Sequence, residues 1–222
     1  MITVQCDRLL INDTNMSRGD IEDCIGRRDL SKYGISIINI RDIRTEIEER
    51  LSCLLWRVDR IILPGRSSSI FLSSMEASIS LDQKVFLPSI RRKLDGMTPR
   101  GIEVSEDDMA RLASIQKEER ILLIDDVVAS GTTINGIAKR LRRLDIDTIT
   151  LVSREPTELK PVLKERLSAW CRVLPRSLRI PAINTLSSLQ EANKANIILE
   201  GFRKLYGQMF TQRVTQLFPN PR

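Results

Sequence analysis

The sequence contains no histidine, and its cysteines are few. Without histidine, catalysis by Ser-His-Asp or Cys-His groups and every histidine-ligated metal site are excluded. Proton transfer must therefore use carboxylates, lysine, tyrosine, cysteine, the substrate or water. The thiols form no Cys-x-x-Cys pair, which argues against a zinc site and, without a secretory signal, against a disulfide framework. We expect reduced, unpaired thiols at Cys6, Cys24, Cys53 and Cys171.

Long apolar runs are also missing. No stretch approaches the roughly 20 apolar residues that are needed to cross a bilayer. The segment from Met1 to Leu10 already carries Asp7 and Arg8, so it lacks the basic-then-apolar pattern of a signal peptide. We therefore expect a cytoplasmic protein without a membrane partner. Aromatic residues make up only 4% of the chain, so few side chains could stack on bases.

The composition is that of an ordinary globular protein. The chain has 222 residues, of which 41% are apolar and 29% are charged, and it is long enough to bury a full core in one domain. Its formal net charge of +6 attracts anions such as phosphates, nucleotides or nucleic acid. The same charge could simply keep the protein soluble, so a nucleic-acid partner is one alternative.

Strands alternate with amphipathic helices through the middle of the chain, which predicts an α/β fold with a parallel sheet and right-handed crossovers. The expected strands are 34–40, 58–63, 84–87, 120–124 and 147–152, and the expected helices are 41–56, 70–81 and 133–144. Between them, residues 88–118 read as a long, polar loop, a length that usually marks a functional or disordered segment.

Both ends of the chain give weaker patterns. Residues 1–34 lack a clean period. Residues 157–170 favour a helix, 171–181 a strand with prolines, and 186–210 a long helix whose apolar stripe could support a homodimer.

The segment with the clearest chemistry is Ile-Leu-Leu-Ile-Asp-Asp-Val-Val-Ala-Ser-Gly-Thr-Thr, from Ile121 to Thr133. It reads as a buried strand, two acids, a tight turn of small residues and a helix. Ligands of open α/β sheets bind at the carboxyl end of such a strand. The turn from Ala129 onward places backbone N–H groups and hydroxyls at a helix N-terminus, which suits phosphate. Gly131 lets the backbone approach that phosphate closely.

The two acids would repel a phosphate, but they suit the vicinal hydroxyls of a ribose, or a magnesium ion. The residues together therefore describe a site for ribose 5-phosphate. A strand-turn-helix that happens to carry two acids is the plain structural alternative. A receiver domain also begins with an apolar strand and paired acids, but the position of the acids in mid-chain and the Ser-Gly-Thr-Thr turn argue against it.

The segment resembles the phosphoribosyl-diphosphate (PRPP) motif of type I phosphoribosyltransferases: four apolar residues, two acids, two apolar residues, a small residue, Ser or Thr, Gly, any residue, and Ser or Thr. Every position fits. The resemblance implies a parallel sheet flanked by helices, magnesium as cofactor, and ribose hydroxyls held by Asp125 and Asp126. It assigns no residue as a direct metal ligand. The 5-phosphate would be held by Ala129, Ser130, Gly131, Thr132 and Thr133.

Two further segments agree with the resemblance. In the family, an earlier strand ends in a small-residue loop that binds the diphosphate, and here the residues of that loop would be Gly65, Arg66, Ser67 and Ser68. An ordinary Pro-Gly turn with serines is the alternative. In the family, a flexible loop also closes over the site, and in the segment 88–118 this role would fall to Arg91, Arg92 and Lys93. A solvated basic loop is the alternative there.

The resemblance covers residues 41–153, the expected core of a single domain 1–222. The variable segments 1–40 and 154–222 would supply the hood that selects the base, with Trp170, Phe202 and Tyr206 as candidates for stacking or for core packing. Members that act on hypoxanthine or guanine carry an aspartate at the position of Ala129. The alanine therefore argues against that subclass and favours the adenine, uracil or amidotransferase type.

Three functions follow as hypotheses. The first is a magnesium-dependent enzyme that transfers ribose 5-phosphate from PRPP to a nucleobase or related acceptor and releases diphosphate. The second is a phosphoribosyltransferase-like binding or regulatory module, either a nucleotide sensor or a nucleic-acid binder. The third is an effector of a bacterial defence or conflict system that is held in a larger complex.

Overall fold

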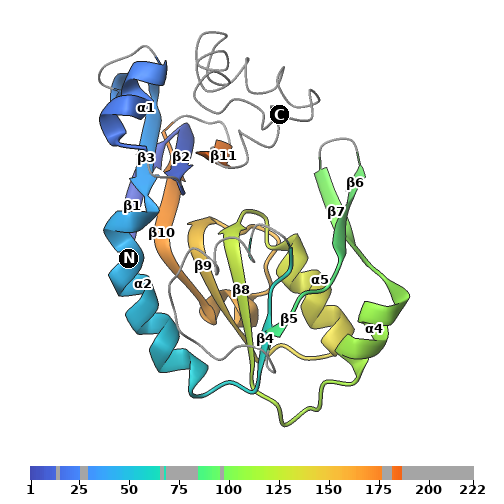
Figure 1. The fold of residues 1–222 in the computed structure, drawn as a ribbon. Coiled ribbons are helices and arrows are strands. Elements are labelled where there is room, and N and C mark those ends of the chain that lie inside the picture. Colours follow the sequence, from blue (N-terminus) through green and yellow to red (C-terminus); the bar gives the residue numbers. More distant parts are fainter. Residues whose placement is uncertain are drawn as a thin grey trace, which may run out of the picture. The chain divides into compact units, whose positions relative to one another are not determined.

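The computed structural model describes residues 1–13, 16–25, 30–65, 68, 85–95, 98–176 and 182–186. These residues fall into two compact units (Figure 1). The first unit comprises Met1–Thr3 and Thr45–Val173, and the second comprises Val4–Arg44 and Leu174–Arg222. No helix in the described part of the chain is long and apolar enough to cross a membrane. The predicted division into a core 41–153 and variable segments 1–40 and 154–222 within one domain stays a proposal.

The larger sheet has six strands in the order β1-β10-β9-β8-β4-β5. The pairings from β10 through β9, β8 and β4 to β5 are all parallel. The strand β8 begins with a continuous buried run, Ile121 to Ile124, as expected for a strand covered on both faces. The predicted α/β fold with a parallel sheet flanked by helices is thus confirmed. The strand bounds are β1 Ile2–Cys6, β4 Arg60–Ile62, β5 Val85–Phe86, β8 Ile121–Val128, β9 Ile146–Arg154 and β10 Leu167–Pro175.

The helix α5 (Thr132–Leu141) follows β8 and covers the sheet with one apolar stripe. Ile134, Ile137 and Ala138 on this stripe belong to the same buried cluster as Leu123 of β8. The helix ends earlier than the predicted 133–144, because Arg142 adopts a left-handed conformation with φ 54° and closes the last turn. The predicted helix 41–56 is confirmed as α2 (Ile40–Leu55).

The segment 88–118 is not the long loop that its polarity predicted. It forms an antiparallel hairpin of β6 (Ile90–Asp95) and β7 (Thr98–Val104), followed by α4 (Glu106–Ala113). Ser105 caps α4 by accepting a hydrogen bond from the N–H of Asp108. The pattern of a serine followed three residues later by an acid is a helix-start signal that the polarity of the segment concealed.

The predicted helix 157–170 is wrong as well. Only the short α6 (Pro161–Glu165) is helical there, and the chain then enters β10 (Leu167–Pro175). Trp170 lies in this strand, which pairs with β9, and is only 3% exposed. Trp170 is therefore a core residue. The other two stacking candidates, Phe202 and Tyr206, lie outside the described residues.

The second unit combines segments from both ends of the chain. Its parallel sheet has the order β11-β2-β3. The bounds are β2 Arg8–Asn12, β3 Ile35–Asn39 and β11 Ala182–Thr185, with the helices α1 Arg18–Ile25 and η1 Leu30–Tyr33. The strand predicted at 34–40 is confirmed as β3. The helices predicted at 70–81 and 186–210 lie outside the described residues, apart from Leu186 itself.

Candidate functional site

The turn between β8 and α5 depends on Gly131. This residue has φ 88°, in the left-handed region that favours glycine. A Cβ atom at Gly131 would lie 2.8 Å from Cβ of Leu159, which is buried against the turn. The backbone conformation and the close packing therefore both require glycine, and they fix the turn at the N-terminus of α5.

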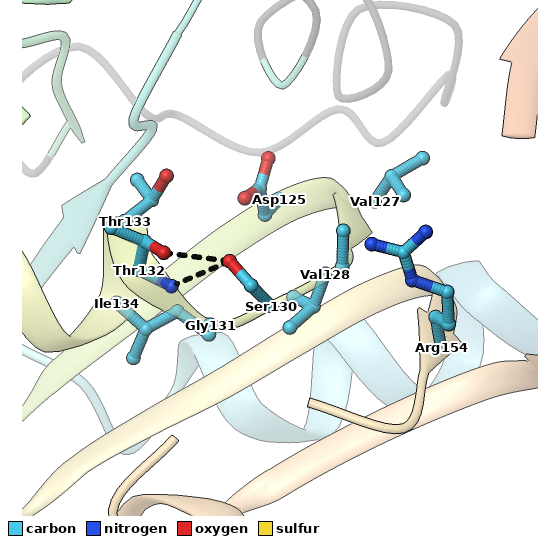
Figure 2. Close-up of a pocket in the computed structure, with 10 residues that line it drawn as sticks. Asp125, Val127, Val128, Ser130, Gly131, Thr132, Thr133, Ile134 and Arg154 are labelled. Atoms are coloured by element: carbon cyan, nitrogen blue, oxygen red, sulfur yellow. Dashed lines mark hydrogen bonds between the residues drawn. The ribbon is translucent and has the colours of Figure 1, made fainter. Parts of the chain in front are cut away.

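A pocket of about 200 Å³ opens at this turn (Figure 2). It lies at the carboxyl ends of the neighbouring parallel strands β8 and β9, the edge at which α/β sheets bind ligands. Its lining joins a buried carboxylate, a half-buried guanidinium and the N–H groups and hydroxyls of the turn. The lining residues are Asp125, Val127, Val128, Ala129, Ser130, Gly131, Thr132, Thr133, Ile134 and Arg154.

Asp125 is the buried acid of the pocket, with only 5% of its surface exposed. Its Oδ1 atom accepts a hydrogen bond from Oγ of Ser68 at 2.9 Å and another from the N–H of Asp126 at 3.0 Å. Ser68 is fully buried and helical, in the segment that follows β4. The structure thus brings Ser68 and the acid of the motif together, although they lie 57 residues apart in the sequence.

Asp126 has a different position. The predicted strand at 120–124 placed both acids after its end. In the structure, both acids lie inside β8. Successive side chains of a strand point to opposite faces, and Asp126 is not among the residues that line the pocket. Its carbonyl oxygen accepts a hydrogen bond from Oγ1 of Thr150 on β9. The pocket therefore receives one of the two acids.

The remaining predicted residues follow β4 in the sequence or belong to the hairpin strand β6. Gly65 is described and is partly buried, whereas Arg66 and Ser67 lie outside the described residues. The residues Arg91, Arg92 and Lys93 belong to β6, where they pair with Glu103, Ile102 and Gly101 of β7. Their assignment to a closing loop stays a prediction, since their side chains are not described.

Arg154 is a site residue that the sequence did not reveal. It is the last residue of β9, and Figure 2 shows its guanidinium at the pocket beside Val128. Burial lowers the pKa of Arg154 from its ordinary value, although an arginine stays cationic at neutral pH. The predicted strand ended at Val152, two residues too early. A strand drawn to its full length would have placed Arg154 at the same sheet edge as the acids.

The hydroxyls of the turn are connected to a second residue that the sequence did not reveal. Oγ of Ser130 lies 2.6 Å from Oγ1 of Thr132, and Oγ1 of Thr132 donates a hydrogen bond to Oε2 of Glu158 at 2.7 Å. Oγ of Ser130 also accepts a hydrogen bond from the N–H of Thr132 at 3.3 Å (Figure 2). The turn thus carries a carboxylate partner from the segment after β9, a region that had been predicted as a helix.

No family model matches the sequence, and no curated protein matches it. Solved structures do resemble the fold. The purine phosphoribosyltransferase of Pyrococcus horikoshii is 13% identical, over 81% of this chain and 92% of its own, with a TM-score of 0.42. The xanthine-guanine-hypoxanthine phosphoribosyltransferase of Helicobacter pylori is 13% identical, over 71% of this chain and 94% of its own, with a TM-score of 0.46. A hypothetical protein from Neisseria gonorrhoeae with bound ppGpp is 12% identical, over 90% of this chain and 100% of its own, with a TM-score of 0.47.

The fold of this chain resembles that of phosphoribosyltransferases. With identities of 12–16% and TM-scores below 0.5, the likeness concerns only the arrangement of helices and strands.

Proposed function

We propose that the chain binds PRPP with magnesium and transfers ribose 5-phosphate to a nucleobase-like acceptor, with release of diphosphate. The observation that carries this proposal is the hydrogen bond between Ser68 and Asp125. It joins the segment after β4 to the acid inside the neighbouring parallel strand β8, which lines the same pocket as the turn before α5. Ligands of open α/β sheets bind at the carboxyl ends of such strands.

In the proposed complex, the turn at the start of α5 holds the 5-phosphate through backbone N–H groups and hydroxyls. Asp125 then faces the ribose, because it lines the same pocket and is held in place through its Oδ1 atom by Ser68 and the N–H of Asp126. Asp126 remains the second candidate for the ribose hydroxyls. Arg154 supplies a fixed cation at the edge of the pocket, where it would attract an anionic part of the ligand.

Magnesium would supply positive charge that stabilises the leaving diphosphate. Among the described residues, no three Asp, Glu or Cys side chains gather as a protein-built metal site would require. Carboxylate oxygens are suitable ligands for this ion, which usually keeps several waters and is held by one or two carboxylates together with substrate phosphates. Asp125, at the pocket, fits that pattern.

Calorimetric titration of PRPP with magnesium tests the proposal. We expect the wild type to bind and Asp125→Asn to bind about tenfold more weakly or worse, the size of one hydrogen bond to a charged group. The asparagine keeps a carbonyl oxygen for Ser68 and Asp126, so the pocket should keep its shape. Asp126→Asn, alone and combined with Asp125→Asn, measures the share of the second acid.

Asp147→Asn is the matched control, since Asp147 lies on β9 in a half-exposed ion pair with Arg166 and should leave binding unchanged. A panel of bases with detection of released diphosphate then tests transfer. Tight binding without release for any acceptor would favour the binding or regulatory module instead. A well-folded wild type that binds no PRPP would contradict the proposal.

A further inference from the structure

Glu158 is the final acceptor in a chain of hydrogen bonds between the hydroxyls of the turn from Ala129 to Thr133. A serine or threonine hydroxyl has one proton to donate. Thr132 donates its proton to Oε2 of Glu158, so the proton in the 2.6 Å contact between Thr132 and Ser130 must come from Ser130. The chain of donors runs from Ser130 to Thr132 to Glu158. While this chain is intact, neither hydroxyl has a proton left for a phosphate oxygen.

The backbone around Glu158 is held without the help of its side chain. The N–H of Glu158 donates to the carbonyl oxygen of Ser130 at 3.1 Å, and Nδ2 of Asn135 donates to the carbonyl oxygen of Glu158. Leu159 packs on Gly131, and the N–H of Lys160 donates to Oδ1 of Asn135 at 3.3 Å. The carboxylate itself is on an exposed residue and can rotate into solvent while the segment stays against the turn.

We propose that the carboxylate of Glu158 competes with an anionic ligand for the hydroxyls of this site. Its carboxylate occupies the hydroxyls that a phosphate monoester would use, and the ligand must displace it before Ser130 and Thr132 can donate to phosphate. The inference rests on the proposed function of the turn as the 5-phosphate site. The inference adds that Glu158 keeps the affinity of the site for the 5-phosphate group of the ligand low.

Competition has two physical parts, and two substitutions separate them. Glu158→Ala removes both the charge and the acceptor, so Thr132 regains its proton for the ligand. Glu158→Gln removes the negative charge, which would repel a phosphate, but keeps an oxygen that accepts the Thr132 proton. Both variants should bind phosphate more tightly, and the alanine variant should gain more.

The test is calorimetric titration of ribose 5-phosphate, which carries the phosphate end of PRPP and no diphosphate. We expect Glu158→Ala to bind it about tenfold more tightly than the wild type, the size of one charge-assisted hydrogen bond. Glu155→Gln is the matched control. Glu155 lies in the same segment but pairs with Lys164 and Arg172, and its variant should bind like the wild type.

Equal or weaker binding of ribose 5-phosphate by Glu158→Ala would overturn the inference, because the carboxylate would then support the turn instead of competing for it. The proposed function is tested separately by the loss of PRPP binding in Asp125→Asn. If that loss is seen while the Glu158 variants change nothing, the proposed function stands and this inference falls. If no variant binds either ligand, both fall.

Discussion

The turn before α5 requires the left-handed backbone conformation of Gly131. We expect Gly131→Ala to lower the free energy of unfolding by about 1–3 kcal/mol, because a side chain there must adopt a φ of 88° and meet Leu159 at 2.8 Å. Urea unfolding measures the loss. Phosphate binding at the turn should weaken in the same variant, since the new methyl group pushes the turn away from Leu159.

Gly65→Ala is the control for the unfolding measurement alone, because a Cβ atom at Gly65 meets nothing within 4 Å and its φ is not in the left-handed region. The double variant Gly131→Ala/Leu159→Gly, compared with Leu159→Gly alone, separates the two causes. Removing Cβ of Leu159 relieves the 2.8 Å contact but leaves the backbone strain. A Gly131→Ala variant as stable as the wild type would mean that the turn can relax, and the case for a fixed phosphate turn would weaken.

At the scale of single residues, the sequence predicted the parts of the site that lie in one continuous segment. The motif gave Asp125 and the turn through Thr133 because their spacing along the chain already defines a strand, a turn and a helix. The sequence did not predict Arg154 and Glu158. Arg154 lines the pocket because β9 pairs beside β8, and Glu158 contacts the turn because the segment after β9 packs against it. No local pattern in the sequence encodes that approach.

The helix α4 provides a prediction at the scale of elements. The carboxylate of Asp108 accepts hydrogen bonds from the N–H of Ser89 at 2.8 Å and from Oγ of Ser105 at 2.8 Å. The N–H of Ser89, then the hydroxyl of Ser105, lower the pKa of Asp108 below its ordinary value. These bonds join the start of α4 to the segment just before the hairpin strand β6, so one ionised carboxylate stabilises the contact between two elements.

The sign of the pH dependence follows from the lowered pKa. A carboxylate whose pKa is lower in the folded state contributes stability above its unfolded pKa, about 3.9, and this contribution is lost as the pH falls through the folded value. Acid should therefore weaken the wild type through this group. Asp108→Asn should cost about 1 kcal/mol at neutral pH, the net size of one hydrogen bond, and should show a smaller further loss in acid.

Urea unfolding at pH 7 and near pH 3 measures both effects. The control is Asp107→Asn, which changes an exposed acid in the same first turn of α4. If Asp108→Asn and Asp107→Asn lose the same stability at both pH values, the stabilisation comes from the charge near the helix N-terminus and not from the bonds to Ser89 and Ser105.

Prediction of the elements succeeded where apolar periodicity was strong and failed where polar residues carried the signal. The strands β4 and β8 and the helices α2 and α5 are mostly apolar on their buried positions, and the sequence located each of them within a few residues. The hairpin β6–β7 is rich in charged residues, so its strands carry no strong apolar period, although they are close in sequence. Trp170 was assigned to a helix because β10 is recognisable only once it pairs with β9.

At the scale of the whole molecule, the second unit joins β2 and β3 from the first part of the chain to β11 from near its end. Residues Leu9 and Ile11 of β2 are fully buried in it. The proposal of one domain over 1–222 requires that this unit and the first unit unfold together. Two independently stable domains would unfold separately, and a ligand that binds one of them would stabilise that one alone.

Hydrogen exchange with and without bound PRPP and magnesium therefore decides between one domain and two. A ligand at 100 times its Kd stabilises the folded state by about 2.7 kcal/mol, or roughly 5–11 °C in melting temperature for a chain of this size. If the chain is one domain, slowly exchanging amides of β2 should gain protection equal to that of β8, since both exchange only through global unfolding. Protection gained by β8 alone would show that the pocket belongs to a separately folding unit. The same experiment on Asp125→Asn, at the same PRPP concentration, should show a smaller gain in both strands and so attribute the effect to this site.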